Sequence, residues 1–376
     1  MRHLNPAPKG PFVNDTHPPA PGGRTTLPGG KEVSRLGIGC WPIGGPAENL
    51  GMPMGWSTAR DSRSLDGLAR AFELGANLFD TADVYGHGHS ERLLGAFLTG
   101  VPRHQVAVTS KVGYFSGSNG NAYDPAHMRV QLEKTLTNLG TDHLDVYALH
   151  NANFGPEDVY LNMAVETMRT FQAEGLIKAV GMRGPHRYAP ERLVPAGTAR
   201  EDKHARFRRH FAIVRPDILA IRDNLLTPRD ATAGIRAFAD ERNVPVIINK
   251  ALGQGLLTGK HAPSRAPAYG AGDHRSRKRW FTEPALRILQ QHLDALRERF
   301  GHEQTDLVHT SLRYLLQRWP AAVVLTGFTS AAQVEQNLST PSTPLTPEDL
   351  AYLAIAGRRA QEALDADGEV FTDESA

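Results

Sequence analysis

The sequence predicts one α/β barrel, in which eight parallel strands alternate with helices. The first observation is the alternation of short apolar runs with helix-like stretches, which implies a parallel sheet. The second is the count of eight such pairs over about 330 residues, the size of a (β/α)₈ barrel with additions. The third is that no linker divides the middle of the 376 residues into two domains.

In the first half of the chain, four apolar runs predict strands, and three of them end in a polar side chain. The runs are 35–39, 76–80, 106–111 and 144–150, and the last three end in Asp80, Lys111 and His150. Apolar residues at helical spacing predict helices at 60–75, 90–98, 124–140 and 157–174. Ser90 stands near the start of the second helix, and Asp124-Pro125 supplies a cap residue and then proline at the start of the third.

The second half repeats the pattern with longer insertions. Strands are predicted at 177–182, 218–221, 244–250 and 322–326. Helices are predicted within 187–212 and at 228–242, 283–300, 304–318, around 333–337 and at 347–364. A loop rich in Gly, Pro and Arg runs from Gly253 to about Trp280. The predicted architecture is therefore a (β/α)₈, or TIM, barrel with extra loops and C-terminal helices.

The two ends of the chain differ from the barrel in composition. Residues 1–30 contain seven Pro and five Gly, a composition that buries too little apolar surface to order itself. We therefore expect an arm at 1–33, mobile or laid along the surface, the barrel at 34–365 and an acidic tail at 366–376.

The composition excludes several classes of partner. A net charge of only +2 offers no global attraction for nucleic acid, and no run of 18 apolar residues predicts a membrane span. Cys40 is the only cysteine, so no intrachain disulfide can form, and we interpret it as a small buried apolar residue. Without an apolar signal region, a cytoplasmic location is expected. The oligomeric state is left open.

Four residues at one end of the predicted barrel predict a proton-donating site. Asp80, Lys111 and His150 end adjacent strands, and Tyr85 follows in the loop after the first of them, with Gly86 permitting a sharp turn. An ammonium beside a phenol favours the phenolate, and a carboxylate fixes the position of that ammonium. With an imidazole that hydrogen-bonds a substrate oxygen, the set can protonate an oxyanion that develops at a carbonyl.

Other charged residues carry weaker predictions. His87 and His89 line the pocket at most, because a metal site needs more converging ligands. The basic residues at 200–210 are interpreted as a solvated helix face. Arg275, Arg277, Lys278, Arg279 and Trp280 follow the seventh strand, where barrels often bind phosphate. Whether this loop contacts a cofactor or an anionic substrate is left open.

The sequence resembles the aldo-keto reductase family over about residues 33–340. The matching segments are 79–86 (FDTADVYG), 90–95 (SERLLG), 109–111 (TSK), 144–150 (LDVYALH), 252–259 (LGQGLLTG) and 333–338 (QVEQNL). The resemblance implies a (β/α)₈ barrel and NAD(P)H-dependent reduction of a small carbonyl substrate. It also implies that Tyr85 is the general acid, that Lys111 and Asp80 tune its pKa, and that His150 orients the carbonyl.

The resemblance is weaker on the nicotinamide side. The family usually has Ser-Asn after strand five, Gln in strand six and Tyr at the end of strand seven, where this chain has Arg183-Gly184, Ala220 and Asn249. No cation for a 2′-phosphate stands in the loop at 327–330. NADP(H) or NAD(H) is the implied cofactor. The implied binding residues are Arg183, Asn249, Lys250, Leu252, Gly253, Gly255, Gly327, Thr329, Gln333, Gln336 and Asn337.

Three interpretations remain open at this stage. In the first, Arg183 and Lys250 replace the lost partners of the nicotinamide amide, and the protein remains a reductase. The altered pocket can instead serve a dehydratase, an isomerase or binding without turnover. The fold can also serve a partner protein, as in potassium-channel β-subunits. For a reductase, Asn151-Ala152-Asn153 after the fourth strand suggests a polar, sugar-like substrate.

Overall fold

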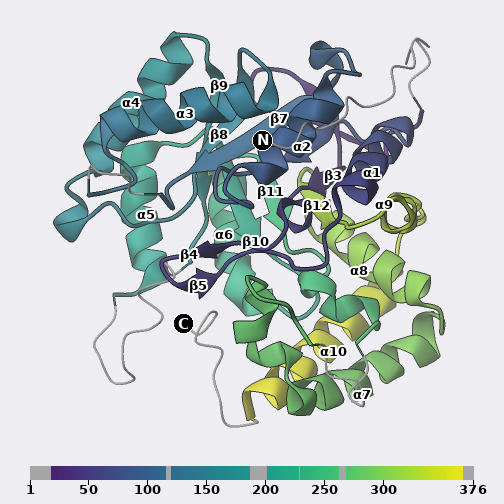
Figure 1. Cartoon of the computed structure of the whole chain (residues 1–376). Coiled ribbons are helices and arrows are strands. Elements are labelled where there is room, and N and C mark those ends of the chain that lie inside the picture. Colours follow the sequence, from purple (N-terminus) through teal and green to yellow (C-terminus); the bar gives the residue numbers. More distant parts are fainter. Residues whose placement is uncertain (1–17, 116–119, 187–200, 228, 262–267, 367–376) are drawn as a thin grey trace.

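Eight parallel strands close into a barrel in the computed structural model, which describes residues 18–115, 120–186, 201–227, 229–261 and 268–366 (Figure 1). In order around the barrel they are β3 (Leu36–Gly39), β6 (Leu78–Asp80), β7 (Ala107–Val112), β8 (Leu144–Leu149), β9 (Ile177–Arg183), β10 (Ile218–Arg222), β11 (Val246–Asn249) and β12 (Val323–Gly327). The barrel closes because β12 pairs with β3. The predicted (β/α)₈ barrel is confirmed, with a strand at every predicted run.

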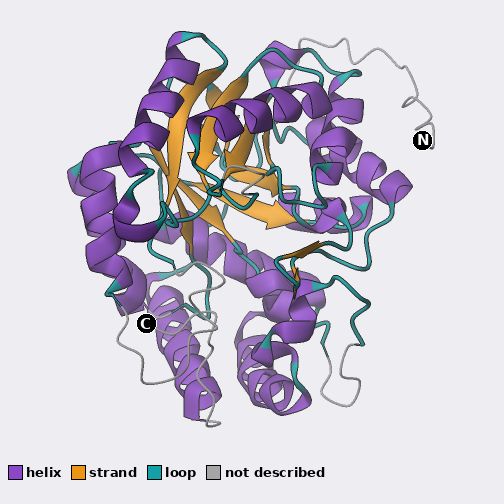
Figure 2. Ribbon diagram, turned by 60° about the vertical axis from the view of Figure 1, so that its left-hand side comes forward, coloured by secondary structure: helices purple, strands orange, loops and turns teal. Residues whose placement is uncertain are grey.

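Helices surround the barrel (Figure 2). The barrel helices are α1 (Asp61–Glu73), α2 (His89–Leu98), α3 (Pro125–Leu139), α4 (Leu161–Ala173), α5 (Lys203–Val214), α6 (Arg229–Glu241), α8 (Gln304–Arg318) and α9 (Ala331–Leu338). Two additional helices, α7 (Glu283–Phe300) and α10 (Pro347–Ala366), pack against each other. Along the parts of the chain described, no helix is both long and apolar enough to cross a membrane.

The ends of two helices test the local predictions. The Asp124 carboxylate accepts a hydrogen bond from the His127 amide at 3.0 Å, with Pro125 in the first turn, as predicted. Ser90 does not cap α2, which begins one residue earlier. Its hydroxyl instead donates to the Cys40 carbonyl at 2.8 Å and ties α2 to the segment after β3.

A hairpin covers the N-terminal end of the barrel, within the range predicted to be an arm. Strands β1 (Arg24–Thr26) and β2 (Glu32–Ser34) pair antiparallel, and Leu27 and Val33 are buried among residues from the starts of the barrel strands. Lys31 Nζ lies 3.6 Å from the Asp145 carboxylate. The prediction that residues 1–30 bury too little apolar surface to become ordered is therefore wrong for 24–30, because two apolar side chains and one ion pair anchor the hairpin. Of the two forms expected for the arm, this part is laid along the barrel rather than mobile. Residues 1–17 and 367–376 lie outside the described part.

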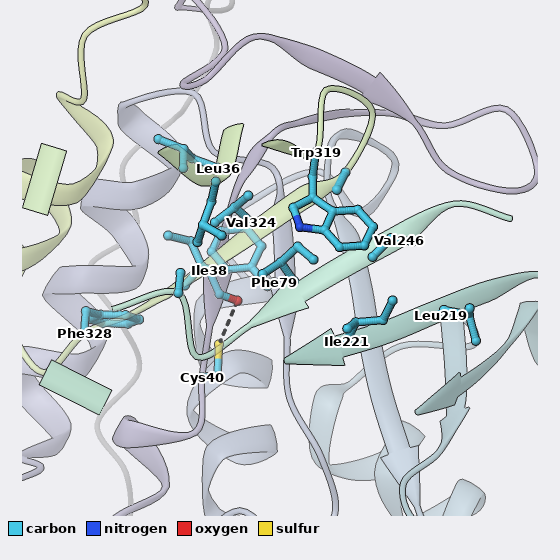
Figure 3. Packing of buried hydrophobic residues seen from close by; sticks show 14 of the residues in the cluster. Leu36, Ile38, Cys40, Phe79, Leu219, Ile221, Val246, Trp319, Val324 and Phe328 are labelled. Carbon is cyan, nitrogen blue, oxygen red and sulfur yellow. Dashed lines mark hydrogen bonds between the residues drawn. The ribbon is translucent and has the colours of Figure 1, made fainter. Parts of the chain in front are cut away.

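A continuous apolar core fills the space between strands and helices (Figure 3). Leu36, Ile38, Phe79 and Val324 belong to it, and all are at most 1% exposed. Cys40 is also buried there, 4.0 Å from the Ile38 carbonyl oxygen, and burial raises the pKa of its thiol. This supports the interpretation of Cys40 as a packing residue.

A second hairpin lies at the opposite end of the barrel. Strands β4 (Glu48–Asn49) and β5 (Met52–Pro53) pair antiparallel in the connection between β3 and α1. Gly55 then bridges Asp273, which belongs to the long loop after β11. Two insertions far apart in sequence therefore meet at the C-terminal ends of the strands.

Candidate active site

A cavity of about 230 Å³ opens at the C-terminal ends of the barrel strands. Six residues at or next to the C-terminal ends of six different strands line it, namely Asp80, Lys111, His150, Arg183, Asn249 and Gly327. This is the face on which enzymes of this architecture carry their chemistry. The convergence predicted for the strand-end residues is therefore present.

Asp80 and Lys111 form a buried ion pair at the base of the cavity. Lys111 Nζ lies 2.7 Å from Asp80 Oδ2 and also donates to the Thr81 carbonyl at 2.6 Å. The Thr109 hydroxyl donates to Asp80 Oδ1 at 2.6 Å. Burial lowers the pKa of Lys111, but the Asp80 carboxylate and the Tyr85 oxygen beside it outweigh burial and hold that pKa above its usual value. The ammonium is therefore charged and fixed in position.

Tyr85 is positioned by a turn that only glycine can make. Gly86 has φ +61°, and a Cβ there would lie 1.9 Å from the Gly44 carbonyl oxygen, so the predicted sharp turn is confirmed. The Tyr85 ring stacks on Trp41, with centroids 5.9 Å apart, and Lys111 Nζ lies 5.1 Å from the Tyr85 centroid. Burial raises the pKa of the phenol, while the Lys111 ammonium pulls it back down. Tyr85 is protonated at neutral pH and has a cation beside it to stabilise the phenolate.

His150 lies edge-on to Tyr85, with ring centroids 5.9 Å apart, and to Tyr114, at 4.8 Å. Burial, together with the cations Lys111 and Arg183, lowers the pKa of His150 well below its usual value. Its Nδ1 is buried and accepts or donates no hydrogen bond among the described residues. His150 is thus a neutral imidazole beside the phenol.

On the opposite side of the cavity, buried polar atoms are left without partners. Asn249 Oδ1 and Gln254 Nε2 make no hydrogen bond within the described residues, and both side chains line the cavity. Strand register places Arg183 beside His150, since Leu149 pairs with Met182. The Asn249 side-chain oxygen can accept hydrogen bonds, and the Gln254 amide and the Arg183 guanidinium can donate them, to a ligand with amide, hydroxyl and phosphate groups. These residues therefore fit a nicotinamide dinucleotide.

The other implied cofactor residues also lie at this site, with one exception. Asn249, Lys250, Leu252, Gly255, Gly327, Thr329, Gln333, Gln336 and Asn337 line the same cavity, and Gly253 borders a smaller neighbouring pocket instead. Gln333 Oε1 accepts from the Thr329 amide at 2.8 Å, and Asn337 Nδ2 donates to the Gly327 carbonyl at 3.3 Å. These two amides therefore shape the turn between β12 and α9.

Aromatic residues form the wall beside Tyr85. Trp41, Trp56 and Tyr114 line the cavity, and Trp41 Nε1 donates to the Met54 carbonyl at 2.8 Å. Sequence reasoning missed both tryptophans, because no local pattern relates them to the strand ends. Gln254 was not singled out either, although it lies within the matched segment 252–259.

The polar mouth inferred from Asn151 and Asn153 is not where it was expected. Neither residue lines the cavity. The Asn151 side chain donates to the Gly113 carbonyl and accepts from the Asn153 amide at 2.8 Å. Asn151 braces the loop after β8, so the observation behind a sugar-like substrate is lost.

The basic loop after β11 divides into structural and cavity-lining residues. Arg275 and Trp280 are buried, whereas Arg277 and Lys278 line the cavity. On α5, Arg206 and Arg209 pair with Asp158 and Glu201 rather than forming a purely solvated face.

The two histidines after Tyr85 do not line the cavity. His87 Nε2 lies 2.7 Å from the Glu48 carbonyl, and His89 Nε2 lies 2.9 Å from Asp61. Over the residues that the structure describes, no three His, Cys, Asp or Glu side chains are grouped so that they could hold a metal ion.

Comparison with known proteins extends over nearly the whole chain. A family model described as "Aldo/keto reductase family" matches residues 35–357. The NADH-specific methylglyoxal reductase of Escherichia coli is 26% identical over 89% of this chain and 96% of its own length. The L-galactose dehydrogenase of Arabidopsis thaliana is 26% identical over 82% of this chain and 85% of its own.

Solved structures share the fold. The glycerol dehydrogenase of Gluconobacter oxydans superposes with a TM-score of 0.68 at 23% identity, over 94% of this chain and 99% of that one. An aldo-keto reductase from Bacillus halodurans, in its holo form, superposes with a TM-score of 0.62 at 20% identity, over 89% of this chain and 95% of that one. With the family model covering most of the barrel, the chain belongs to the aldo/keto reductase family.

Proposed function

We propose that this protein is an NAD(P)H-dependent oxidoreductase that reduces an aldehyde or ketone to an alcohol, with Tyr85 as the general acid. The observation that carries the proposal is the buried Asp80–Lys111 pair beside Tyr85 and His150, all facing one cavity. Family membership supports carbonyl reduction in general, and the geometry supports the assignment of roles.

The four residues divide the proton chemistry between them. The neutral His150 ring holds the carbonyl oxygen, and the Tyr85 hydroxyl gives that oxygen its proton. Lys111 stabilises the phenolate that is left, and Asp80 holds Lys111 in place. The nicotinamide, when bound, supplies the hydride, because no side chain can.

The opposite side of the cavity is proposed to hold the dinucleotide. Arg183 and Asn249 provide a donor and an acceptor where relatives carry other amide partners, and Lys250 adds a charge. Charge-assisted hydrogen bonds are roughly twice as strong as neutral ones, so Arg183 can compensate for the lost Ser and Asn. The remaining implied residues, Leu252, Gly253, Gly255, Gly327, Thr329, Gln333, Gln336 and Asn337, are proposed to frame the rest of the cofactor.

Titration with NADH and NADPH tests the proposal. Trp41 and Trp56 line the cavity, so quenching of intrinsic fluorescence should report binding. We expect either cofactor to bind, Arg183→Ala to weaken binding about tenfold or more, and Arg287→Ala, on the exposed face of α7, to leave it unchanged. Turnover is then measured with methylglyoxal, a sugar aldehyde and a glycerol-derived carbonyl, chosen from the activities named for the relatives.

The result that overturns the proposal is absence of binding of both cofactors at millimolar concentration. A dehydratase, an isomerase or a binding subunit on the same fold would then be favoured. Binding without reduction of any carbonyl in the panel would retain the cofactor site and overturn the reductase.

A further inference from the structure

The long loop after β11 packs a histidine against both tryptophans of the cavity wall. The ring centroid of His274 lies 4.2 Å from that of Trp41 and 4.8 Å from that of Trp56. His274 is 0% exposed and does not line the cavity, whereas both tryptophans do. His274 therefore acts on the cavity through the two indoles that it supports.

Trp41 connects this cluster of rings to the proposed proton donor. The Trp41 ring stacks on Tyr85 with centroids 5.9 Å apart, and it contacts Trp56 edge to face at 5.7 Å. Trp41 Nε1 donates to the Met54 carbonyl at 2.8 Å. Three neighbouring rings and one hydrogen bond thus set the position of the Trp41 indole. A change in any of them would move the cavity surface next to Tyr85.

His274 is itself held by a set of hydrogen bonds. Its amide donates to the Gly55 carbonyl at 3.0 Å, and its Nδ1 lies 3.0 Å from the same oxygen. The preceding residue, Asp273, is fully buried and accepts from the Ser57 amide and hydroxyl, each at 2.8 Å. The Arg275 guanidinium binds the same carboxylate at 2.7 and 2.9 Å. These contacts fix His274 before any ligand arrives.

The His274 side chain is a neutral, flat ring with one directed hydrogen bond. A carbonyl oxygen only accepts, so Nδ1 carries the proton and donates it to Gly55. Nε2 is buried and has no hydrogen-bond partner among the described residues. Burial lowers the pKa of His274 well below its usual value, so the ring is uncharged at neutral pH. What this ring contributes to the cluster is therefore its shape and its fixed orientation.

We propose that His274 is a positioning residue for carbonyl reduction, which holds the Trp41 indole in place and thereby sets the size of substrate that fits beside Tyr85. This inference rests on the proposed function and adds a residue that selects substrates by size. Protein interiors are close-packed, so a ring removed from the cluster leaves space that its neighbours partly occupy. Trp41 would move into that space, and the cavity would widen next to the proposed proton donor.

Substitutions of graded size test this role. His274→Ala leaves the largest space, His274→Leu fills part of it, and His274→Phe keeps a flat ring there. Two aldehydes that differ by one phenyl ring, propanal and 3-phenylpropanal, report the width of the cavity. We expect the ratio of kcat/KM for 3-phenylpropanal to that for propanal to rise about five- to tenfold in His274→Ala, mainly through KM. The ratio should rise less in His274→Leu and stay within about twofold of the parent in His274→Phe.

A displaced Trp41 should also be visible in two other measurements. Because Tyr85 packs on Trp41, its hydroxyl loses its fixed position, and kcat for both aldehydes should fall about tenfold in His274→Ala. The near-ultraviolet circular dichroism spectrum reports the surroundings of tryptophan rings. It should change in His274→Ala and largely return in His274→Phe, and this measurement needs neither substrate nor cofactor.

His210 provides a matched control. It is also 0% exposed and packs edge-on against one aromatic ring, that of Phe154, at 5.0 Å, but it lies on α5 and does not line the cavity. His210→Ala should lower the melting temperature as His274→Ala does, because both remove a buried ring. Only His274→Ala should change the substrate ratio. NADH affinity should be unchanged in both variants.

An unchanged substrate ratio in His274→Ala would overturn this inference and leave the reductase intact, since His274 would then serve stability alone. Where His274→Ala does not fold, the ratio in His274→Leu decides in the same way. A ratio in His274→Phe as high as in His274→Ala would also overturn it, because filling the space would not be what positions Trp41. Failure of the parent to reduce any carbonyl would overturn the proposed function as well.

Discussion

The two sides of the cavity differ in how far the protein satisfies its own polar groups. On the side of β6 and β7, both Asp80 oxygens and the Lys111 ammonium have protein partners at 2.6–2.7 Å. On the side of β11, Asn249 Oδ1 and Gln254 Nε2 have none among the described residues. The Asp80–Lys111 pair is complete without a ligand, whereas we propose that a ligand completes the opposite side.

This difference has an energetic meaning. A buried polar atom without a partner costs about 1–3 kcal/mol, which a ligand that supplies the partner can return as affinity. The paired side gains stability from its contacts and holds the Lys111 ammonium beside Tyr85, the proposed proton donor. Changes on the two sides should therefore have opposite signatures: lost catalysis and stability on one, lost affinity at unchanged stability on the other.

Removing the proton donor should have the largest effect on turnover. Tyr85→Phe deletes one hydroxyl, and general acid catalysis typically contributes 10²- to 10⁴-fold, so we expect kcat for carbonyl reduction to fall about 10³-fold. NADH affinity and the circular dichroism spectrum should stay unchanged, because the ring still packs on Trp41. Reduction at the parental rate would show that another group is the acid.

Breaking the buried pair should reduce both activity and stability. Lys111→Met leaves the Asp80 carboxylate buried and unpaired, which costs about 3–5 kcal/mol of unfolding free energy. It also removes the cation that lowers the pKa of Tyr85, so the alkaline limb of the reduction profile should move to higher pH while the rate drops.

A double variant separates the two effects of Lys111. Adding Asp80→Asn to Lys111→Met removes the unpaired charge, so stability should partly return in urea unfolding while activity does not. A double variant no more stable than Lys111→Met would show that the pair is not what stabilises this side.

Detaching the cavity wall should mainly affect stability. Asp273→Asn removes the charge that holds Ser57 and Arg275, and we expect a loss of up to about 3–5 kcal/mol. Burial raises the pKa of Asp273, but the hydrogen bonds of Arg275 and Ser57 outweigh it and hold that pKa below its usual value. The carboxylate therefore stabilises the fold above its unfolded pKa of about 3.9, and this contribution is lost as pH falls through the folded pKa.

Thermal melts from pH 7 downward measure this contribution. The difference in melting temperature between the parent and Asp273→Asn should become smaller as the pH becomes acidic. Asp61→Asn is the control, because Asp61 is half-exposed and its one ion-pair partner in the described part of the chain is His89, at 2.9 Å. It should therefore change stability by less than about 1 kcal/mol. A pH-independent gap for Asp273→Asn would contradict the charge-based explanation.

A change on the β11 side of the cavity, where polar atoms lack partners among the described residues, should affect only the affinity for the cofactor. Asn249→Ala removes an acceptor that has no partner among the described residues, so the melting temperature should not fall. The Kd for NADH should rise about 2- to 13-fold, the value of one neutral hydrogen bond. A lower melting temperature with unchanged Kd would reverse the assignment of this side.

The smallest effect concerns pH. The pKa of His150 lies well below its usual value because of burial and the neighbouring cations, and that of Tyr85 lies above its usual value because of burial. Neither group changes protonation near neutrality, so kcat for reduction should vary less than about twofold between about pH 7 and 9. A steep change in this range would mean that one of them titrates there.

The sequence by itself determined the barrel and the positions of the residues that we propose for proton transfer. Apolar runs and helical spacing are local patterns, and each strand end fixes which side chain reaches the cavity, so Asp80, Lys111 and His150 could be placed without coordinates. The Gly86 turn after Tyr85 could also be placed, because glycine tolerates the positive φ that a sharp turn requires.

Only the tertiary structure showed which residues form the cavity wall and which segment covers the N-terminal end of the barrel. The wall joins Trp41, Ser57 and Asp273 across more than 200 residues, and no periodicity in the sequence relates them. The hairpin at 24–34 is ordered by the barrel beneath it, although its Pro- and Gly-rich surroundings predicted an arm. Asn151 was assigned to the cavity mouth on adjacency alone, yet it turns inward to the Gly113 carbonyl. Contacts between distant segments are set by where the packed elements bring them, and that information is not local.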